Sequence, residues 1–212
     1  MLEKHLKHPS ERKYSGVYTD TDIGVLMNYG RVGANKYNDR QIMHEPMFLN
    51  ALRTLIDYER PSYIFEFGVF QGGLSQFMSD AAKNCGHQMK IISFDIDIYN
   101  SDSINKIDDV ELVQLDVLDI KHYLTTSHEM IANFEGTKFV IDDIGINSLF
   151  LLDSIDPYLS KNDHFICCHT LNKEIHDQLM DYASGKYSVN TLSCDMFGEN
   201  FVENPNGFLV KN

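Results

Sequence analysis

The stretch "YIFEFGVFQGGLSQFMSDAAK", residues 63–83, determines how the rest of the chain is interpreted. An apolar run ends at Glu66, and three glycines then precede a segment whose apolar residues recur at helical spacing: Gly68, Gly72 and Gly73. Glycine permits tight turns and a close approach of the backbone to a neighbour. The stretch therefore predicts a buried strand, a tight turn and an amphipathic helix.

The same alternation of strand and helix continues along the chain. Apolar runs that end in acids or in Cys-His follow at residues 89–97, 110–116, 138–143 and 163–169. Segments with helical spacing accompany them at residues 45–61, 72–86, 117–134, 147–159 and 171–184. This order is typical of an α/β domain with a mostly parallel sheet and helices on both faces.

The two ends of the chain differ from this pattern. Residues 187–194 and 206–212 are predicted to form a final antiparallel hairpin. Residues 1–44 are polar and weakly periodic, and we interpret them as an arm or lid with little regular structure rather than as an independent domain. Residues 45–212 are interpreted as one domain, a size that buries a substantial core without disulfides.

The overall charge limits the classes of partner. The 212 residues carry a formal net charge of −13, which argues against nucleic acids and anionic membrane surfaces as partners. We recognise neither a signal peptide nor an apolar run approaching the roughly 18 residues of a membrane span. The four cysteines lack C-x-x-C spacing, and we expect them to be reduced in a cytoplasmic protein: Cys85, Cys167, Cys168 and Cys194.

Acidic residues follow one predicted strand after another, and the carboxyl ends of parallel strands meet at one edge of a sheet. The glycine pattern E-x-G-x-x-x-G-G lacks the G-x-G-x-x-G of dinucleotide-binding folds. These features favour a nucleoside ligand without phosphate, such as S-adenosylmethionine (SAM). The expected cofactor-binding residues are the glycine turn, the acids at the strand ends and the valine after Asp116: Glu66, Gly68, Gly72, Gly73, Asp95, Asp97, Asp116, Val117 and Asp142.

Three of these acids have specific expected roles. Glu66 either orients the glycine turn or binds the ammonium group of SAM. Asp95 ends the second strand, where a carboxylate can accept both ribose hydroxyls, and Asp116 ends the third, within reach of the adenine amino group. For any one acid, the alternative is a helix cap or a solvated strand end.

The motifs "FEFGVFQGG", "ISFDID", "VQLDVLD", "FVIDDIGINSLFLLDSIDPYLSKNDHFIC" and "NPNGFLVKN" occur in this order along the chain. Together they resemble class I SAM-dependent methyltransferases, and more narrowly the cephalosporin hydroxylase/rhamnosyl O-methyltransferase family. The resemblance covers the chain from about residue 44 to the end. It implies a seven-stranded Rossmann-like sheet with a reversed last strand. It also implies methyl transfer to an oxygen, commonly on a sugar or a natural product and often assisted by Mg²⁺.

The resemblance further implies a metal held by the first acid after strand four and by an acidic pair that ends strand five. A histidine base is expected three residues after that first acid. Here Asp142 is the first acid, but Gly145 stands at the histidine position and Cys168-His169 replaces the acidic pair. Because Mg²⁺ prefers oxygen ligands, we assign no metal ligand. Asp142, Cys168 and His169 would suit a softer ion such as zinc; the alternative is that no metal binds.

Methyl transfer also needs a group that removes the proton of the acceptor. His169 lies at a predicted strand end, and histidine is the side chain that most readily serves as a general base near neutrality. Asp143 would orient His169 or act as the base itself, and His44 would lean over the acceptor from the segment before the first helix. The alternatives are a hydrogen-bonded histidine at the sheet edge for His169 and ordinary helix capping for His44.

Two functions remain open from the sequence. The first is a SAM-dependent O-methyltransferase acting on a small acceptor, for which a sugar or sugar-containing metabolite is favoured. The second is a SAM-binding or regulatory protein of the same fold whose chemistry is altered. A homodimer is a possible assembly, since an N-terminal arm can pack against a second subunit.

Overall fold

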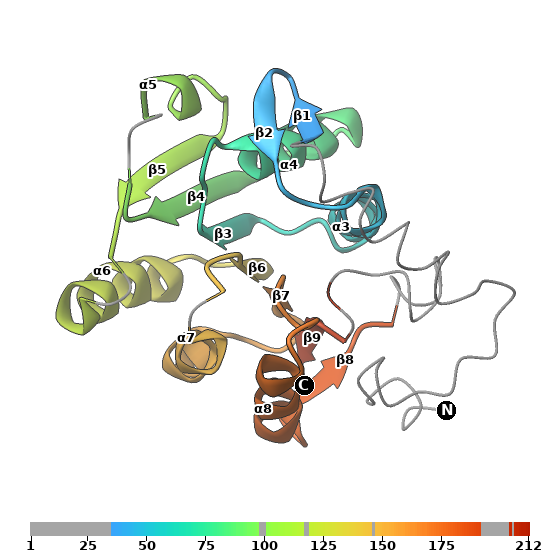
Figure 1. The fold of residues 1–212 in the computed structure, drawn as a ribbon, viewed down its shortest axis with the longest axis vertical. Helices are drawn as coiled ribbons and strands as arrows, with labels where there is room; N and C mark the ends of the chain where they lie inside the picture. Colours follow the sequence, from blue (N-terminus) through green and yellow to red (C-terminus); the bar gives the residue numbers. More distant parts are fainter. Residues whose placement is uncertain (1–34, 98–100, 117–118, 146, 192–203, 205) are drawn as a thin grey trace, which may run out of the picture.

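The structure, a computed structural model, describes residues 35–97, 101–116, 119–145, 147–191, 204 and 206–212. Seven strands form one sheet in the order β5-β4-β3-β6-β7-β9-β8 (Figure 1). Their bounds are β3 Tyr63–Phe67, β4 Lys90–Asp95, β5 Val110–Gln114, β6 Lys138–Asp142, β7 His164–Cys167, β8 Tyr187–Val189 and β9 Phe208–Lys211.

The strand directions agree with the sequence prediction. Strands β5, β4, β3, β6 and β7 pair in parallel, and β9 pairs antiparallel with both β7 and β8. The expectations of a mostly parallel seven-stranded sheet and a reversed last strand are therefore confirmed. The antiparallel pairing of β8 with β9 confirms the predicted final hairpin, although residues 192–203 between them lie outside the described residues.

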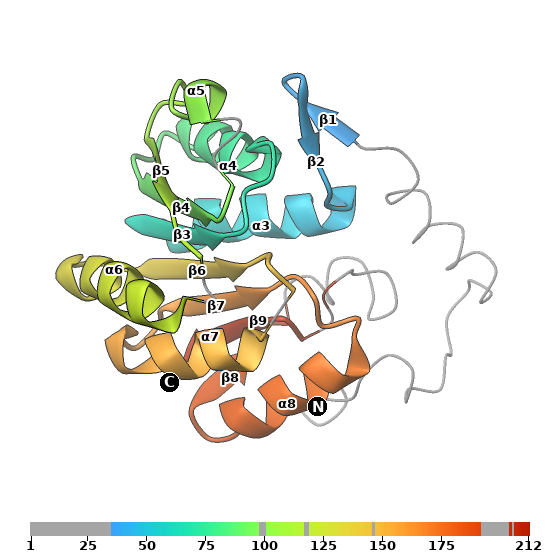
Figure 2. The same cartoon turned by 60° about the vertical axis from the view of Figure 1, so that its left-hand side comes forward.

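Helices cover both faces of the sheet (Figure 2). Helices α3 and α4 lie on one face, and α6, α7 and α8 lie on the other. The bounds are α3 Pro46–Glu59, α4 Gly73–Asn84, α5 Ser101–Ile104, α6 Ile120–Asn133, α7 Ser148–Ile155, the 3-10 helix η2 Asp156–Tyr158 and α8 Lys173–Ala183. The central strands are apolar on both faces because each face is covered, so alternate side chains enter different cores.

A small hairpin precedes the main sheet, and the sequence analysis did not predict it. Strands β1 Asn35–Tyr37 and β2 Arg40–Ile42 pair antiparallel. Their two turn residues, Asn38 and Asp39, both have positive φ, which is the geometry that tight two-residue hairpin turns require. The part of residues 1–44 that the structure describes therefore has regular structure. The proposed domain boundary near residue 45 stays a prediction.

The hairpin packs on α4 and on the glycine turn. The Arg40 guanidinium donates hydrogen bonds to Ser103 Oγ at 3.0 Å and to the Ser103 carbonyl at 2.6 Å. The backbone N–H of Gln41 donates to Gln71 Oε1 at 3.2 Å. Tyr37 meets Phe77 of α4 edge to face, with ring centroids 5.4 Å apart. These contacts place the hairpin beside the turn that follows β3.

Candidate active site

The sheet register brings the predicted strand ends together. Phe67 pairs with Phe94 on one side and with Asp142 on the other, and Asp142 pairs with Cys167. The pairing of β3 with β6 extends one residue further, because the Asp143 N–H donates to the Phe67 carbonyl at 2.8 Å. The glycine turn, Asp142–Asp143 and Cys168–His169 therefore follow three neighbouring strands at one edge of the sheet.

Glu66 is fully buried under this edge. One of its oxygens, Oε2, accepts hydrogen bonds from Ser75 Oγ at 2.5 Å and Ser93 Oγ at 2.6 Å, while Oε1 has no hydrogen-bond partner among the described residues. Burial is the main reason that the pKa of Glu66 is raised to about 7; the two serines act in the opposite direction. Because Ser75 belongs to the first turn of α4, Glu66 ties β3 to the helix after the glycine turn.

Two glycines of the turn are required by neighbouring backbone. A Cβ atom at Gly68, whose φ is +93°, would lie 2.8 Å from the Asp143 carbonyl oxygen. A Cβ atom at Gly73 would lie 2.1 Å from the Gln41 carbonyl oxygen of the hairpin. Gly72 immediately precedes α4 as its N-cap residue. The missing side chains thus allow β6 and the hairpin to approach the turn closely.

Asp95, at the end of β4, supports the same turn. Its Oδ2 accepts the Val69 N–H at 2.7 Å and the Phe70 N–H at 3.0 Å, and its Oδ1 accepts the Asp97 N–H at 2.9 Å. A carboxylate offers about four acceptor positions, so three donors leave about one for a ligand hydroxyl, fewer than the two ribose hydroxyls expected from the sequence.

The remaining predicted cofactor residues lie in different surroundings. Asp97 is exposed and Asp116 is half-buried beyond β5. Val117 lies outside the described residues. Asp142 is fully buried, with its Oδ1 accepting the Ile144 N–H at 3.3 Å and its Oδ2 3.6 Å from Cys167 Sγ. Burial is the main cause that raises the pKa of Asp142, against hydrogen bonding from Ser148.

Asp142 and Glu66 point to opposite faces of the sheet. Glu66 lies toward Ser75 of α4, whereas Asp142 lies toward Ser148 of α7. The alternation of side chains along a strand is the reason, since Glu66 pairs with Ile141 and Asp142 pairs with Phe67. The carboxyl ends of β3 and β6 therefore lie side by side as expected, but the carboxylates of Glu66 and Asp142 lie on opposite faces of the sheet.

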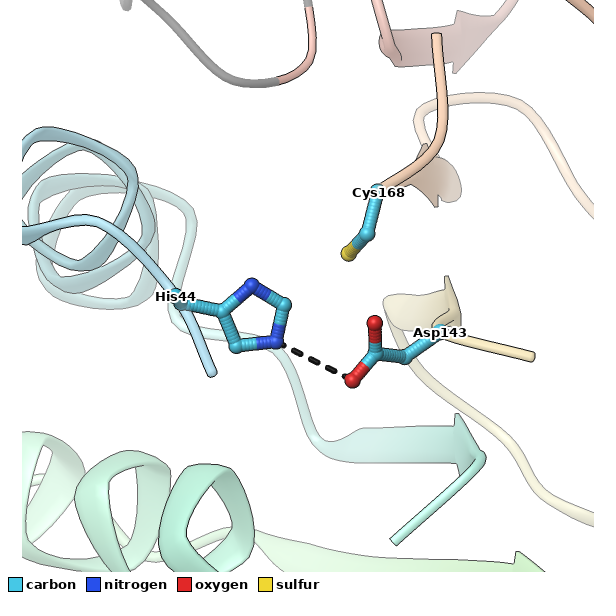
Figure 3. A group of neighbouring side chains, drawn as sticks. All are labelled: His44, Asp143 and Cys168. Atoms are coloured by element: carbon cyan, nitrogen blue, oxygen red, sulfur yellow. Dashed lines mark hydrogen bonds and ion pairs between the residues drawn. The ribbon is translucent and has the colours of Figure 1, made fainter. Parts of the chain in front are cut away.

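The three predicted catalytic residues come together around one carboxylate. His44 Nε2 lies 3.1 Å from Asp143 Oδ2, and His169 Nε2 lies 3.6 Å from Asp143 Oδ1. Cys168 lies beside this pair, and Figure 3 shows its sulfur directed toward His44 and Asp143. His44 is buried and its ring lies over Phe48, with centroids 4.6 Å apart. Two histidines therefore lie beside the two oxygens of the same carboxylate.

Sequence reasoning missed several parts of this arrangement. It did not identify Ser75 and Ser93 as the partners of Glu66, because both look like ordinary helix and strand residues. It grouped Cys168 with Asp142, whereas the structure groups Cys168 with Asp143 and His44. The available signal was the alternation of Cys167 and Cys168, since two successive side chains point to opposite faces.

The magnesium site that the resemblance implies does not fit these residues. Mg²⁺ requires oxygen ligands in near-octahedral geometry. Cys168 and His169 supply sulfur and nitrogen at the places of the expected acidic pair, and Asp142 is directed toward Ser148 on the other face. No catalytic role for Mg²⁺ follows from this chain.

Comparisons with known proteins add information about the fold. No protein-family model matches the sequence, and no curated protein matches it. Among solved structures, CmcI with Mg and SAM has a TM-score of 0.66 and 18% identity, over 96% of this chain and 82% of that one. An apo structure of a CmcI form that differs at one position has a TM-score of 0.69 and 17% identity, over 95% of this chain and 82% of that one.

A third structure is a protein from Staphylococcus aureus that is provisionally named a caffeoyl-CoA O-methyltransferase. Its TM-score is 0.57 at 14% identity, with 92% of this chain and 93% of that chain covered. Similarity at this level of identity reports on the fold. The chain therefore has the Rossmann-like fold that CmcI and this methyltransferase share.

Proposed function

We propose that the chain is a SAM-dependent O-methyltransferase acting on a hydroxyl group of a small acceptor, a sugar or sugar-containing metabolite. One observation carries the proposal. The glycine turn after β3 and the carboxylate at the end of β4 lie at the same sheet edge as two histidines that share Asp143. CmcI, which has this fold, was determined with SAM.

The turn and the strand-end acids would hold the cofactor, which supplies an electrophilic methyl group on sulfur. Gly68 lets the backbone turn in the left-handed region next to β6. Asp95 fixes the turn through the Val69 and Phe70 amides and keeps acceptor capacity for a ribose hydroxyl. Asp116, Asp97 and Val117 remain proposed contacts farther along the cofactor. Glu66 orients the turn from below through Ser75, as its burial favours.

His169 is the proposed general base. About a third of its side chain is exposed, while its Nε2 is buried and has no hydrogen-bond partner among the described residues. An acceptor hydroxyl that reaches the imidazole ring would give up its proton to His169 as the oxygen attacks in line with the departing sulfur. Asp143, 3.6 Å away, would stabilise the imidazolium that forms, and His44 holds the second oxygen of Asp143.

The charge of the chain favours a neutral acceptor. A net charge of −13 provides no general attraction for phosphates or acids. Among the described residues, no helix is both long enough and apolar enough to cross a membrane. A sugar hydroxyl is a neutral acceptor of the kind that the charge favours.

The test is a binding and turnover experiment on the full chain. SAM binding is measured by calorimetry, and release of the demethylated nucleoside product is assayed with a panel of neutral sugars and sugar phosphates. We expect His169→Ala to abolish turnover while the affinity for SAM stays within about twofold. His87→Ala is the matched control, because His87 bonds the Pro61 carbonyl, away from the site. Undiminished turnover in His169→Ala would remove His169 from the role of base.

A second function is favoured by one observation. Cys168 and His169 stand where the resemblance implies an acidic pair, so the chain could bind SAM without transferring its methyl group. Binding of SAM without turnover on any acceptor would support this regulatory function. Absence of SAM binding would contradict both functions.

A further inference from the structure

His44, Asp143 and Cys168 place three different metal-ligating atoms in one small volume (Figure 3). A nitrogen, a carboxylate oxygen and a sulfur all lie within 4.8 Å of one another. His44 and Cys168 are buried, and Asp143 is half-buried.

The three residues come from separate parts of the chain, and the fold holds each in place. His44 precedes α3 and lies over Phe48. Asp143 follows β6, with its N–H bonded to the Phe67 carbonyl at 2.8 Å. Cys168 follows β7, with its N–H bonded to the Asp142 carbonyl at 3.0 Å. The donors are thus carried by the rigid sheet and the entry of a helix rather than by a single loop.

We propose that His44, Asp143 and Cys168 bind one borderline divalent transition-metal ion, with Zn²⁺ as the first choice. Imidazole nitrogen and thiolate sulfur are ligands that Zn²⁺ prefers, and a carboxylate completes many of its sites. Mg²⁺ is excluded as the preferred ion because only one of the three residues supplies oxygen. The inference does not depend on methyl transfer, since metal binding is measured without cofactor or acceptor.

The spacing of the donors is close to that of a zinc site. Zinc bond lengths of about 2.0–2.3 Å in a tetrahedron place the ligand atoms roughly 3.3–3.8 Å apart. His44 Nε2 and Asp143 Oδ2 are already 3.1 Å apart, and all three donors are within 4.8 Å. Small side-chain rotations of Cys168 and Asp143 would complete the geometry. Three protein ligands leave a fourth position, which zinc sites of this kind give to water or to a ligand oxygen.

His169 and Cys167 border the cluster but are not among its ligands. His169 Nε2 is 3.6 Å from Asp143 Oδ1, on the oxygen that His44 does not contact. Cys167 is buried on the opposite face of the sheet, 3.6 Å from Ser148 Oγ and from Asp142. The adjacent cysteines therefore form an internal comparison: one thiol belongs to the proposed site and its neighbour does not.

The first experiment measures metal binding by the full chain. The protein is stripped with a chelator and titrated with Zn²⁺ against a chromophoric competitor, and the bound metal is counted by elemental analysis. We expect one Zn²⁺ per chain and no saturable binding of Mg²⁺ at comparable concentration. With Co²⁺ as the probe, we expect a thiolate-to-metal charge-transfer band. Absence of stoichiometric Zn²⁺ binding, or a Co²⁺ spectrum without that band, would overturn the proposal.

The second experiment assigns the ligands. Cys168→Ser and His44→Gln should each weaken Zn²⁺ binding by about 100-fold or more, beyond the effect of altering a residue that only supports a ligand. Cys167→Ser and Cys85→Ser are matched controls and should leave the affinity within about threefold. Zn²⁺ binding that survives Cys168→Ser, or that is lost only in Cys167→Ser, would contradict the assignment. Circular dichroism confirms folding of each variant, and His44→Gln decides the matter if Cys168→Ser fails to fold.

The third experiment changes the ion preference. Cys168→Asp replaces the soft sulfur by a hard oxygen at the same place. We expect the ratio of Zn²⁺ affinity to Mn²⁺ affinity to fall at least about tenfold. An unchanged ratio would show that the Cys168 side chain does not contact the ion.

Discussion

Gly145 packs directly against the imidazole ring of His169. A Cβ atom at Gly145 would lie 3.1 Å from both Cε1 and Nε2 of the ring and 3.2 Å from Nδ1. Gly145 also has a φ of +72°, in the left-handed region. The resemblance implies a histidine base at position 145, but here Gly145 leaves the space that the ring of His169 fills.

Gly145→Ala should impair turnover without impairing the cofactor site. The added methyl group would displace the His169 ring, and displacement of a reacting group by about 1 Å can reduce the rate as much as 100-fold. We expect kcat to fall about 10- to 100-fold, with the SAM affinity within about twofold of the original. Steady-state kinetics and calorimetry provide the two measurements.

The matched control is Gly185→Ala. Gly185 has a φ of +75°, but a Cβ atom there would meet nothing within 4 Å. Both variants carry the cost of a non-glycine residue at positive φ, about 1 kcal/mol, whereas only Gly145→Ala touches a histidine. Equal kcat in the two variants would show that His169 does not depend on Gly145.

Gly73→Ala should separate the β1–β2 hairpin from α4. Gly73 does not have a positive φ, so the cost of alanine arises from the Gln41 carbonyl, which would be 2.1 Å from the new Cβ atom. Overpacking of this kind costs about 1–3 kcal/mol. We expect a lower free energy of unfolding in urea and faster proteolysis within residues 35–42. If both stay unchanged, the hairpin is not seated on α4 in solution.

Glu66→Gln should change how stability depends on pH. Burial raises the pKa of Glu66 to about 7 in the folded chain, above its ordinary value of 4.5, so the folded state holds the proton more tightly than the unfolded state. The contribution of protonated Glu66 is fully present below pH 4.5 and is lost as the pH rises through 7. At about 1.4 kcal/mol per pKa unit, up to about 3 kcal/mol is involved.

Glutamine has the same shape and stays neutral, and its carbonyl oxygen can accept the Ser75 and Ser93 hydroxyls as Oε2 does. We therefore expect Glu66→Gln and the original chain to be similarly stable near pH 4.5, and the variant to be more stable at pH 8. Urea denaturation across this pH range measures the difference in free energy of unfolding between the two proteins. The effects of titrating groups that both proteins contain, such as His164, cancel in this difference. If the difference in free energy of unfolding does not grow as the pH rises, the pKa of Glu66 is not raised in the folded chain.

Much of the fold could be predicted because its signals are local. The apolar run before Glu66, the glycines after it and the helical spacing beyond them each extend over a few residues, and repeated alternation with helices specifies a parallel sheet. The β1–β2 hairpin was missed because its signal is short. Asn38 and Asp39 carry the turn without a glycine, and the flanking strands are three residues each.

The sequence by itself determined the order of strands and helices, and it placed acids, Cys168 and His169 at the carboxyl ends of the strands. Only the tertiary structure decided which of these side chains meet. His44 and Asp143 are 99 residues apart and touch because α3 packs on the face of the sheet that carries Phe139 and Ile141 of β6. Likewise, Glu66 and Asp142 separate because neighbouring strands in register direct them to opposite faces. Periodicity shows which residues share a face of one strand, but what lies against that face depends on the packing of distant elements.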